Sequence, residues 1–363
     1  MIKPQSSQSV RVAATLLSVV ILVFSLSQLQ DILVPIIFAG ILSFLLLPVN
    51  NFFETRLKFP RVLGIIVTIL LAGAMIAAVV WLMVGQIKTF DQIWPQMIKK
   101  GEEWLEMGQS FIAERFSVTE GTQLTEARKY LTDLLKNSGS FISGTLSNTT
   151  GFLANLSLIP LYIFLMLLYR DFFQEFLYKA FKSVSNHRID VVLGKIKSVV
   201  QSYMSGLLLV ILIVGTLNTT ALLLLGIPNA VFFGFFAAVL VLVPYIGVAI
   251  GSLLPIMMAL ITKDSAWYAV GVAASFGFIQ FLEGNFITPF IVGSKVSINS
   301  LVAIISLLLF GSLWGISGLV LALPLTAIIK VLFDNIEKFR PIGFLLGDAD
   351  HSDVGKKRKR VKN

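Results

Sequence analysis

The sequence predicts an all-α integral membrane protein with about eight transmembrane helices, and three observations lead to this fold class. Hydrophobic residues make up 56% of the 363 positions and charged residues only 13%, whereas a soluble domain carries about 25% charged residues. The apolar residues fall into blocks of about 17 to 25, the length at which a helix crosses a hydrocarbon core about 30 Å thick. Prolines and glycines interrupt several blocks in the C-terminal half, which predicts a broken or re-entrant segment there.

Residues 1–87 are predicted to form three transmembrane helices, over about 12–26, 32–49 and 62–84. Arg56, Lys58 and Arg61 lie in the short loop before the third helix, and two more basic residues precede the first. Basic residues beside membrane spans favour the cytoplasmic side. We therefore expect the N-terminus and this loop to be cytoplasmic.

Residues 88–150 differ in composition and are predicted to form a small helical region outside the membrane, on the extracytoplasmic side. They hold seven Lys or Arg and eight Asp or Glu, but Leu124, Leu131 and Leu135 keep the spacing of one helix face. Long loops are exempt from the charge bias that orients short ones. The basic residues therefore do not exclude an outside location.

Residues 151–198 are predicted to hold the fourth transmembrane helix, 152–169, followed by a basic amphipathic helix on the cytoplasmic face. From Arg170 onward this second part has six Lys or Arg against three acidic residues. Phe172, Phe173 and Phe176 share one face of it, as in helices that lie on a membrane surface. Packing of that face against other protein explains the pattern equally well.

Residues 199–336 are predicted to form a C-terminal transmembrane core with broken helices. Pro244 and Pro255 interrupt the apolar stretch 230–262, which predicts one crossing with a kink or an unwound middle. Because the basic tail, residues 337–363, should be cytoplasmic like the N-terminus, the number of crossings is expected to be even. Eight crossings satisfy this condition if residues 283–310 enter the membrane without crossing it, or pack against the bundle.

The sequence offers little material for enzymatic or metal chemistry. It has no Cys and only two His, His187 and His351, so a thiolate or histidine metal site and a Ser/His/Asp triad are not expected. No Gly-rich phosphate loop occurs either. We therefore expect neither enzyme activity nor a cofactor. The basic tail is interpreted as a solvated cytoplasmic segment, so no nucleic-acid partner is expected.

One acidic residue stands alone in the C-terminal core. Glu283 is the only carboxylate between Asp264 and Asp334, and an ionisable group at membrane depth costs at least ~2.5 kcal/mol, which makes it a candidate functional residue. The alternative is that it ends a helix at the headgroup level. The solute or ion pathway is predicted to include further residues of the broken segments, each of which could instead be a simple helix contact: Gln280, Asn285, Pro289, Pro244, Tyr245 and Asn218.

Two Gly-x-x-x-Gly pairs are predicted to serve helix packing, Gly247 with Gly251 and Gly311 with Gly315. Small residues at this spacing let two helix backbones approach closely. The contact could form within one chain or between subunits.

Several of these motifs follow one another in a distinctive order. They are Val243-Pro244-Tyr245-Ile246-Gly247, then Glu283-Gly284-Asn285 with Pro289 and Gly293-Ser294, then Gly311-Ser312-Leu313-Trp314-Gly315 with Gly318 and Pro324-Leu325. The series resembles the signature of the autoinducer-2 exporter family, and the expected eight-span layout with a long outside loop after the third span agrees with that family. One residue departs from it, because Ser300 stands where the family usually has proline, at the start of the final helical segment.

The resemblance implies a bacterial inner-membrane protein that exports a small organic molecule. Some family members are linked to the quorum-sensing furanone signal, and others to the exchange of sodium or lithium for protons. The resemblance also implies a homo-oligomer, with a pentamer as the expected arrangement.

Together, the residues and the resemblance predict a secondary transporter whose solute path is formed around Pro244 and residues 283–289. Discontinuous helices expose backbone dipoles at the membrane midplane, where solutes and coupling ions bind. Its partners would be the lipid bilayer, a small solute and H+ or Na+. A monovalent cation/proton antiporter, a passive channel and a membrane scaffold remain as alternatives.

Overall fold

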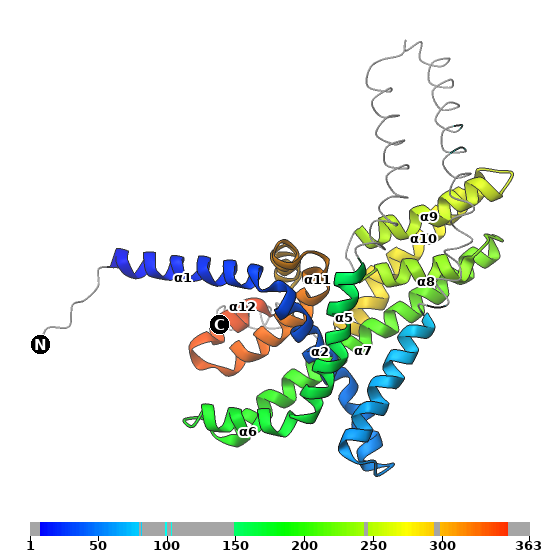
Figure 1. Ribbon diagram of the computed structural model, residues 1–363. Coiled ribbons are helices and arrows are strands. Elements are labelled where there is room, and N and C mark those ends of the chain that lie inside the picture. The colour runs from blue at the N-terminus through cyan, green and yellow to red at the C-terminus, as the bar shows by residue number, and fades with distance from the viewer. Residues whose placement is uncertain are drawn as a thin grey trace, which may run out of the picture. The chain divides into compact units, whose positions relative to one another are not determined.

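The computed structural model describes residues 8–79, 81, 99, 103, 149–242, 246–293 and 298–347. Every regular element in these residues is a helix, so the all-α prediction is confirmed for the described part of the chain (Figure 1). The predicted extracytoplasmic region, residues 88–150, lies almost wholly outside the described residues. The same holds for the predicted basic tail beyond residue 347.

Five helices of the described part are long and apolar enough to cross a membrane: Gln30–Thr55, Arg61–Val79, Asn186–Leu224, Trp267–Val292 and Ser300–Asn335. Shorter apolar helices accompany them: Val12–Gln28, Leu158–Leu168, Ala230–Leu240 and Ile250–Thr262. These lengths support an integral membrane protein. The number of eight crossings remains a prediction.

The chain divides into two compact units, each built from segments that are distant in the sequence. Unit 1 takes Met1–Ile69, Asn155–Gly206 and Val292–Asn363, and unit 2 takes Leu70–Ala154 and Leu207–Ile291. Because the long helix α7 (Asn186–Leu224) runs across one of these boundaries, it contributes its first part to unit 1 and its second part to unit 2.

Unit 1 packs apolar helices around two clusters of buried side chains. In one cluster, Ala39 and Ile65 pack with Ile163. In the other, Val200 and Trp314 pack across further helices. The helices of this unit are α1 (Gln8–Gln28), α2 (Gln30–Thr55), the first half of Arg61–Val79, most of α5 (Thr149–Leu168), α6 (Arg170–Ala180), the start of α7, α11 (Ser300–Asn335), η3 (Glu337–Phe339) and α12 (Arg340–Leu346).

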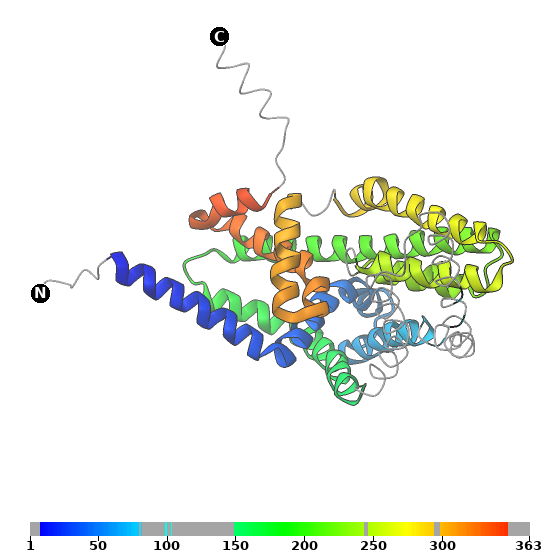
Figure 2. The same cartoon turned by 90° about the horizontal axis from the view of Figure 1, so that it is seen from above.

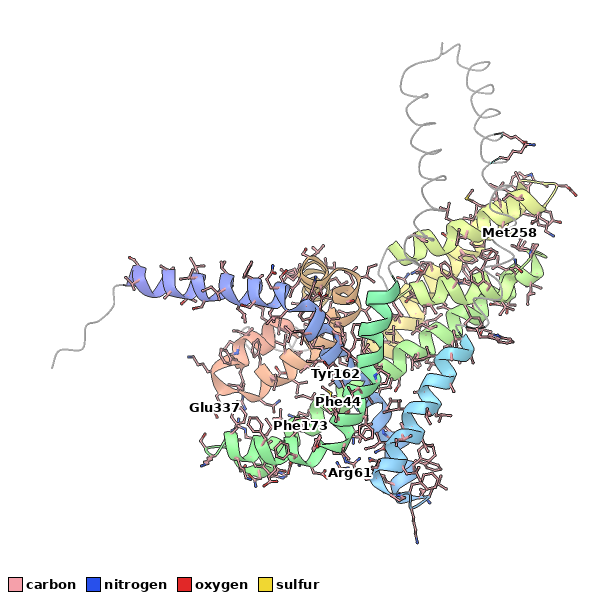
Figure 3. All side chains as sticks on the ribbon, in the orientation of Figure 1. Phe44, Arg61, Tyr162, Phe173, Met258 and Glu337 are labelled. Carbon is pink, nitrogen blue, oxygen red and sulfur yellow. The ribbon has the colours of Figure 1, made fainter. Side chains whose placement is uncertain are left out.

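Ion pairs join the ends of three helices in unit 1. Arg170 Nη2 lies 2.6 Å from Glu54 Oε2, and Arg61 Nη1 lies 2.6 Å from Asp171 Oδ2. Asn50 adds a hydrogen bond from its Nδ2 to Glu54 Oε1 at 2.8 Å. Arg61, labelled in Figure 3, begins the helix that follows the basic loop. The arginine therefore has a packing role beside its predicted role in setting the membrane orientation.

Helix α11 folds back on itself (Figure 2). Trp314 and Gly315 depart from helical geometry, with φ of −132° and 59°, and a positive φ favours glycine. A Cβ placed on Gly318 would lie 1.8 Å from the Phe310 oxygen, so the two arms touch. The first arm, 300–313, is about 21 Å long at 1.5 Å per residue. This is shorter than the hydrocarbon core, but residues 283–292 extend the membrane-capable helix Trp267–Val292, so the non-crossing segment 283–310 stays a prediction.

The start of α11 is defined by a side chain rather than by proline. Ser300 is its first residue. The Asn299 side chain accepts a hydrogen bond from the Val302 N–H at 2.9 Å, which is an N-cap. The departure from the family pattern at Ser300 therefore leaves a well-defined helix start.

Unit 2 is a bundle of successive antiparallel helices: the second part of α7, α8 (Ala230–Leu240), α9 (Ile246–Thr262) and α10 (Trp267–Leu282). Its core contains Leu222, Phe233, Met258 and Val272, with Met258 labelled in Figure 3. α7 and α8 approach closely, because a Cβ on Gly234 would lie 2.6 Å from the Thr219 nitrogen.

The stretch 230–262 forms two helices, so the prediction of one kinked crossing is wrong. A Cβ on Gly247 would lie 1.7 Å from the Leu240 oxygen, and one on Gly251 would lie 2.8 Å from the Ala237 Cα. Gly247, near the start of α9, faces the last residue of α8, whereas Gly251, further along α9, faces a residue nearer the start of α8. The two helices therefore run antiparallel. No polar residue marks the reversal, because residues 241–246 are as apolar as their neighbours except for Tyr245. Hydropathy alone therefore could not reveal it.

Candidate functional site

Glu283 lies at the end of α10 in unit 2, and only 7% of its surface is exposed. It is the only buried carboxylate in the described part of the chain. Gln280 Nε2 donates to Glu283 Oε2 at 2.7 Å, and Thr288 Oγ1 donates to Glu283 Oε1 at 2.5 Å. Each carboxylate oxygen therefore has a donor, which offsets part of the cost of burying a charge.

A change of helix type brings Thr288 to Glu283. From Glu283 the chain continues as two π-helical turns, η1 (Glu283–Ile287) and η2 (Pro289–Gly293). The Thr288 N–H bonds to the Glu283 carbonyl, the five-residue step of a π-turn. In an α-helix the side chains that face each other are three or four residues apart. The wider turn therefore creates a contact that regular helix geometry does not allow, and such turns are frequent at functional sites.

A small cavity beside Gln280 brings α7 into the same site. It measures about 10 Å³ and is lined by Asn218, Gln280 and apolar residues of α7, α8 and α10, which leaves room for about one water molecule. Asn218 Oδ1 and Thr219 Oγ1 are buried without a hydrogen-bond partner among the described residues. An unpaired buried polar atom costs about 1–3 kcal/mol, so a polar guest that reached these oxygens would be stabilised.

The predicted pathway residues divide into two groups. Glu283, Gln280 and Asn218 come together in the interior of unit 2, whereas Asn285 and Pro289 are exposed. Asn285 Nδ2 donates to the Phe281 carbonyl at 2.9 Å and so serves the junction between α10 and the π-turns. Pro244 and Tyr245 lie outside the described residues.

The four predicted packing glycines occupy different environments. Gly247 and Gly251 lie where α9 contacts α8, and a Cβ on Gly311 would lie 2.8 Å from Leu319 on the other arm of α11. Gly315 forms the turn of α11, and a Cβ there would have no neighbour within 4 Å among the described residues. All the contacts named here lie within one chain.

Thr288 is absent from the residues that the sequence predicts for the pathway. Its contact with Glu283 spans five positions, and sequence patterns for helices search for partners three or four positions away. The signal that points to it is indirect: Pro289 follows it and lacks the N–H of a regular helix. A proline shortly after a lone buried carboxylate is a reason to examine five-residue spacings.

The arrangement can hold a proton or bind a small polar group inside an apolar bundle. Carboxylates within membrane helices commonly carry protons or mark ion pathways. Gln280 links the carboxylate to the cavity, because it donates to Glu283 and lines the cavity wall. Within the described residues, no cluster of three or more His, Cys, Asp or Glu could hold a metal ion.

Comparisons with known proteins agree with a role in transport. YueF of Bacillus subtilis (strain 168), named as a transport protein, is 26% identical over 322 residues, which cover 83% of each chain. YrrI of the same strain, also named as a transport protein, is 24% identical over 86% of this chain and 88% of its own. The AI-2 transport protein TqsA of Escherichia coli (strain K12) is 30% identical over 139 residues, 38% of this chain and 40% of its own.

The family described as "AI-2E family transporter" matches residues 16–338, which include every described helix from α2 to α11 and the whole Glu283 site. The apolar helices, the buried carboxylate and this match lead to the same conclusion. The chain is a membrane transport protein that belongs to the AI-2E transporter family.

Proposed function

We propose that the protein exports a small organic solute resembling autoinducer-2 by secondary transport, with Glu283 as the group that couples solute movement to protons. The observation that carries this proposal is the burial of Glu283 between two donors, one of which, Gln280, lines a cavity together with Asn218 and its unpaired oxygen. A structural carboxylate needs no such cavity. The name of TqsA, an AI-2 transport protein, supports the choice of solute class.

The proposed path uses the interior of unit 2. The solute would meet Asn218 and Gln280, whose polar groups line the cavity, while Glu283 would bind and release the proton. A cavity of about 10 Å³ holds no organic solute, so α8 or the π-helical turns must move during transport. Short helices packed through glycines allow such shifts, because few side chains interlock between them.

We further propose that the protein lies in a bacterial inner membrane with both termini in the cytoplasm, and that it acts as a homo-oligomer. Support for the orientation comes from the basic residues before the first and third helices and in the tail. Support for the oligomer comes from the family resemblance alone.

The experiment that tests the proposal measures autoinducer-2 flux in proteoliposomes with and without an imposed proton gradient. The wild-type protein should concentrate autoinducer-2 when the gradient is present, and Glu283→Gln should abolish both the accumulation and the pH dependence of flux. Glu175→Gln is the matched control, since Glu175 is an exposed residue of α6 paired with Lys179, and it should behave like the wild type.

Each alternative function gives a different result in the same assay. A passive channel would let autoinducer-2 equilibrate but would not concentrate it. A cation/proton antiporter would move protons when a sodium gradient is imposed and would leave autoinducer-2 where it was. Accumulation that persists unchanged in Glu283→Gln would remove Glu283 from the mechanism.

A further inference from the structure

A large pocket formed by the described residues lies in unit 1 and shares no residue with the Glu283 site. It measures about 460 Å³, within the range of about 300–1,000 Å³ that ligand sites occupy. Its wall is formed by the end of α6, the start of α7, the end of α11 and η3. Most of the lining is apolar, with side chains from these elements and the turn after α6: Leu177, Phe181, Ile189, Val192, Ile196 and Leu332.

Two cations and one anion line the same pocket. They are Arg188 from α7 and Lys338 and Glu337 from η3, with Glu337 labelled in Figure 3. Arg188 Nη2 donates to the Asn335 carbonyl at 2.9 Å, and a guanidinium has five N–H donors, so others remain for a ligand. The exposed Lys338 side chain makes no hydrogen bond or ion pair with a described residue. Lys195 adds a further positive charge nearby, since its Nζ lies 3.0 Å from Asn335 Oδ1.

Asp190, the acidic residue near the start of α7, already accepts two hydrogen bonds from side chains of α6. Asp190 accepts hydrogen bonds from the Tyr178 hydroxyl and from Gln174 Nε2, the latter at 2.7 Å. The bond to Asp190 raises the pKa of Tyr178, so the hydroxyl stays a donor. These bonds hold α6 against α7. Asp190 does not line the pocket, and Glu337 is the only acidic residue among the described residues that do.

The exposed side chains of helix α6 indicate the environment that surrounds this part of unit 1. None of its residues, all of which are described, is buried. Phe172, Phe173 and Phe176 are 65%, 49% and 59% exposed, and Phe173 is labelled in Figure 3. Exposed aromatic side chains along one amphipathic helix are typical of helices that lie in the headgroup region of a bilayer. Because Leu177 of α6 lines the pocket, an occupant of the pocket would lie close to these headgroups.

We propose that this pocket binds an anionic phospholipid, with an acyl chain against the apolar wall and the phosphate on Arg188 and Lys338. Basic pockets between membrane helices on the cytoplasmic side suit such headgroups, and α7 and α11 are both membrane-capable helices. The chain's own basic tail is excluded as the occupant, because its six Lys and Arg among the last eight residues have the same sign as the pocket cations. A soluble anion would leave the apolar wall unused.

Native mass spectrometry of the full-length protein tests this proposal. The detergent-purified protein is incubated with equal amounts of phosphatidylglycerol and phosphatidylcholine that carry identical acyl chains. The wild type should retain mainly phosphatidylglycerol. The preference should fall about fivefold in Arg188→Gln or Lys338→Gln and about thirtyfold in the double variant, the effect expected for one and two interfacial cations. Glu337→Gln should increase the preference.

Three controls distinguish binding inside the pocket from attraction to the protein surface at large. Lys182 lies in the turn after α6 and does not line the pocket. Lys182→Gln removes its positive charge and should leave the preference for phosphatidylglycerol unchanged. Val192→Trp fills the pocket and should reduce the binding of both lipids. An excess of inorganic phosphate should not displace phosphatidylglycerol, because phosphate cannot use the apolar wall.

The proposal is overturned by an unchanged preference in Lys338→Gln, a variant that breaks no ion pair with a described residue. It is equally overturned if Lys182→Gln lowers the preference as much, which would indicate general surface charge, or if phosphate displaces the lipid. Should Val192→Trp alter the oligomeric state but not lipid binding, the pocket is instead a contact between copies of the chain.

Discussion

The interior of unit 2 contains a few polar side chains, although membrane helix bundles are generally filled with apolar ones. Glu283 is buried with two donors, whereas Asn218 and Thr219 keep buried oxygens without partners among the described residues. Each unpaired oxygen costs about 1–3 kcal/mol of folding free energy. These residues therefore lower the stability of the resting protein, and a polar guest in the cavity would recover part of that cost. Two substitutions test this relation between stability and transport.

Thr288→Val should slow autoinducer-2 transport at least about tenfold, because it removes a hydrogen bond to a charged group worth about 1.5–3 kcal/mol. Flux into proteoliposomes measures the effect. In a Glu283→Gln background the same change should add little, since coupled residues are not additive. Thr220→Val is the control, because its hydroxyl bonds to the Thr216 carbonyl of its own helix at 2.8 Å. Equal losses from both valine variants would show that Thr288 has no special role.

Asn218→Leu should raise the stability of the protein by about 1–3 kcal/mol while it reduces transport, because it replaces an unpaired buried amide oxygen by an apolar group. Thermal unfolding in detergent measures the stability. Asn299→Leu makes a useful contrast: the Asn299 amide caps α11 and donates to Leu345 and Gly347, so this variant should be less stable than the wild type. An Asn218→Leu protein that is destabilised but fully active would contradict the proposed relation.

At the scale of elements, backward turns and changes of helix type build the candidate site. α8 and α9 form an antiparallel pair of 11 and 17 residues, and α10 passes into π-turns at Glu283. Each feature depends on a glycine or a carboxylate rather than on hydropathy. Small residues allow these short helices to touch backbone to backbone, which lets polar groups approach without a layer of large side chains between them.

Gly251→Ala should destabilise the protein by about 1–3 kcal/mol, the typical cost of overpacking. The new Cβ would lie 2.8 Å from the Ala237 Cα, which is backbone and cannot rotate away. Gly277→Ala is the matched control in the same unit, because a Cβ there meets no described atom within 4 Å. Alanine at that helical position should be neutral or stabilising by up to about 1 kcal/mol. Unfolding temperatures that fall equally in the two variants would show that close α8–α9 contact does not matter.

At the scale of the whole molecule, the sequence predicts the all-α membrane fold well because composition and block length depend only on the solvent that surrounds each helix. The same reasoning fails at the α8–α9 reversal, since a turn among apolar residues has no hydropathy signal. For the site, the lone carboxylate at Glu283 was predictable from its isolation, and Asn218 from its polarity. Thr288 was not predictable, because its contact depends on a π-turn. The exposure of Asn285 agrees with helical spacing, because a residue two positions after Glu283 lies on a different face of the helix, and the predicted pathway did not take this into account.

Coupling between proton and solute movement is the central claim, and it can be measured directly by recording both fluxes in the same proteoliposomes. A pH-sensitive dye trapped inside reports protons while autoinducer-2 is sampled outside. We expect the two fluxes to keep a fixed ratio in the wild type, and Glu283→Gln to abolish the proton flux. Autoinducer-2 flux without any accompanying proton flux in the wild type would contradict the coupling.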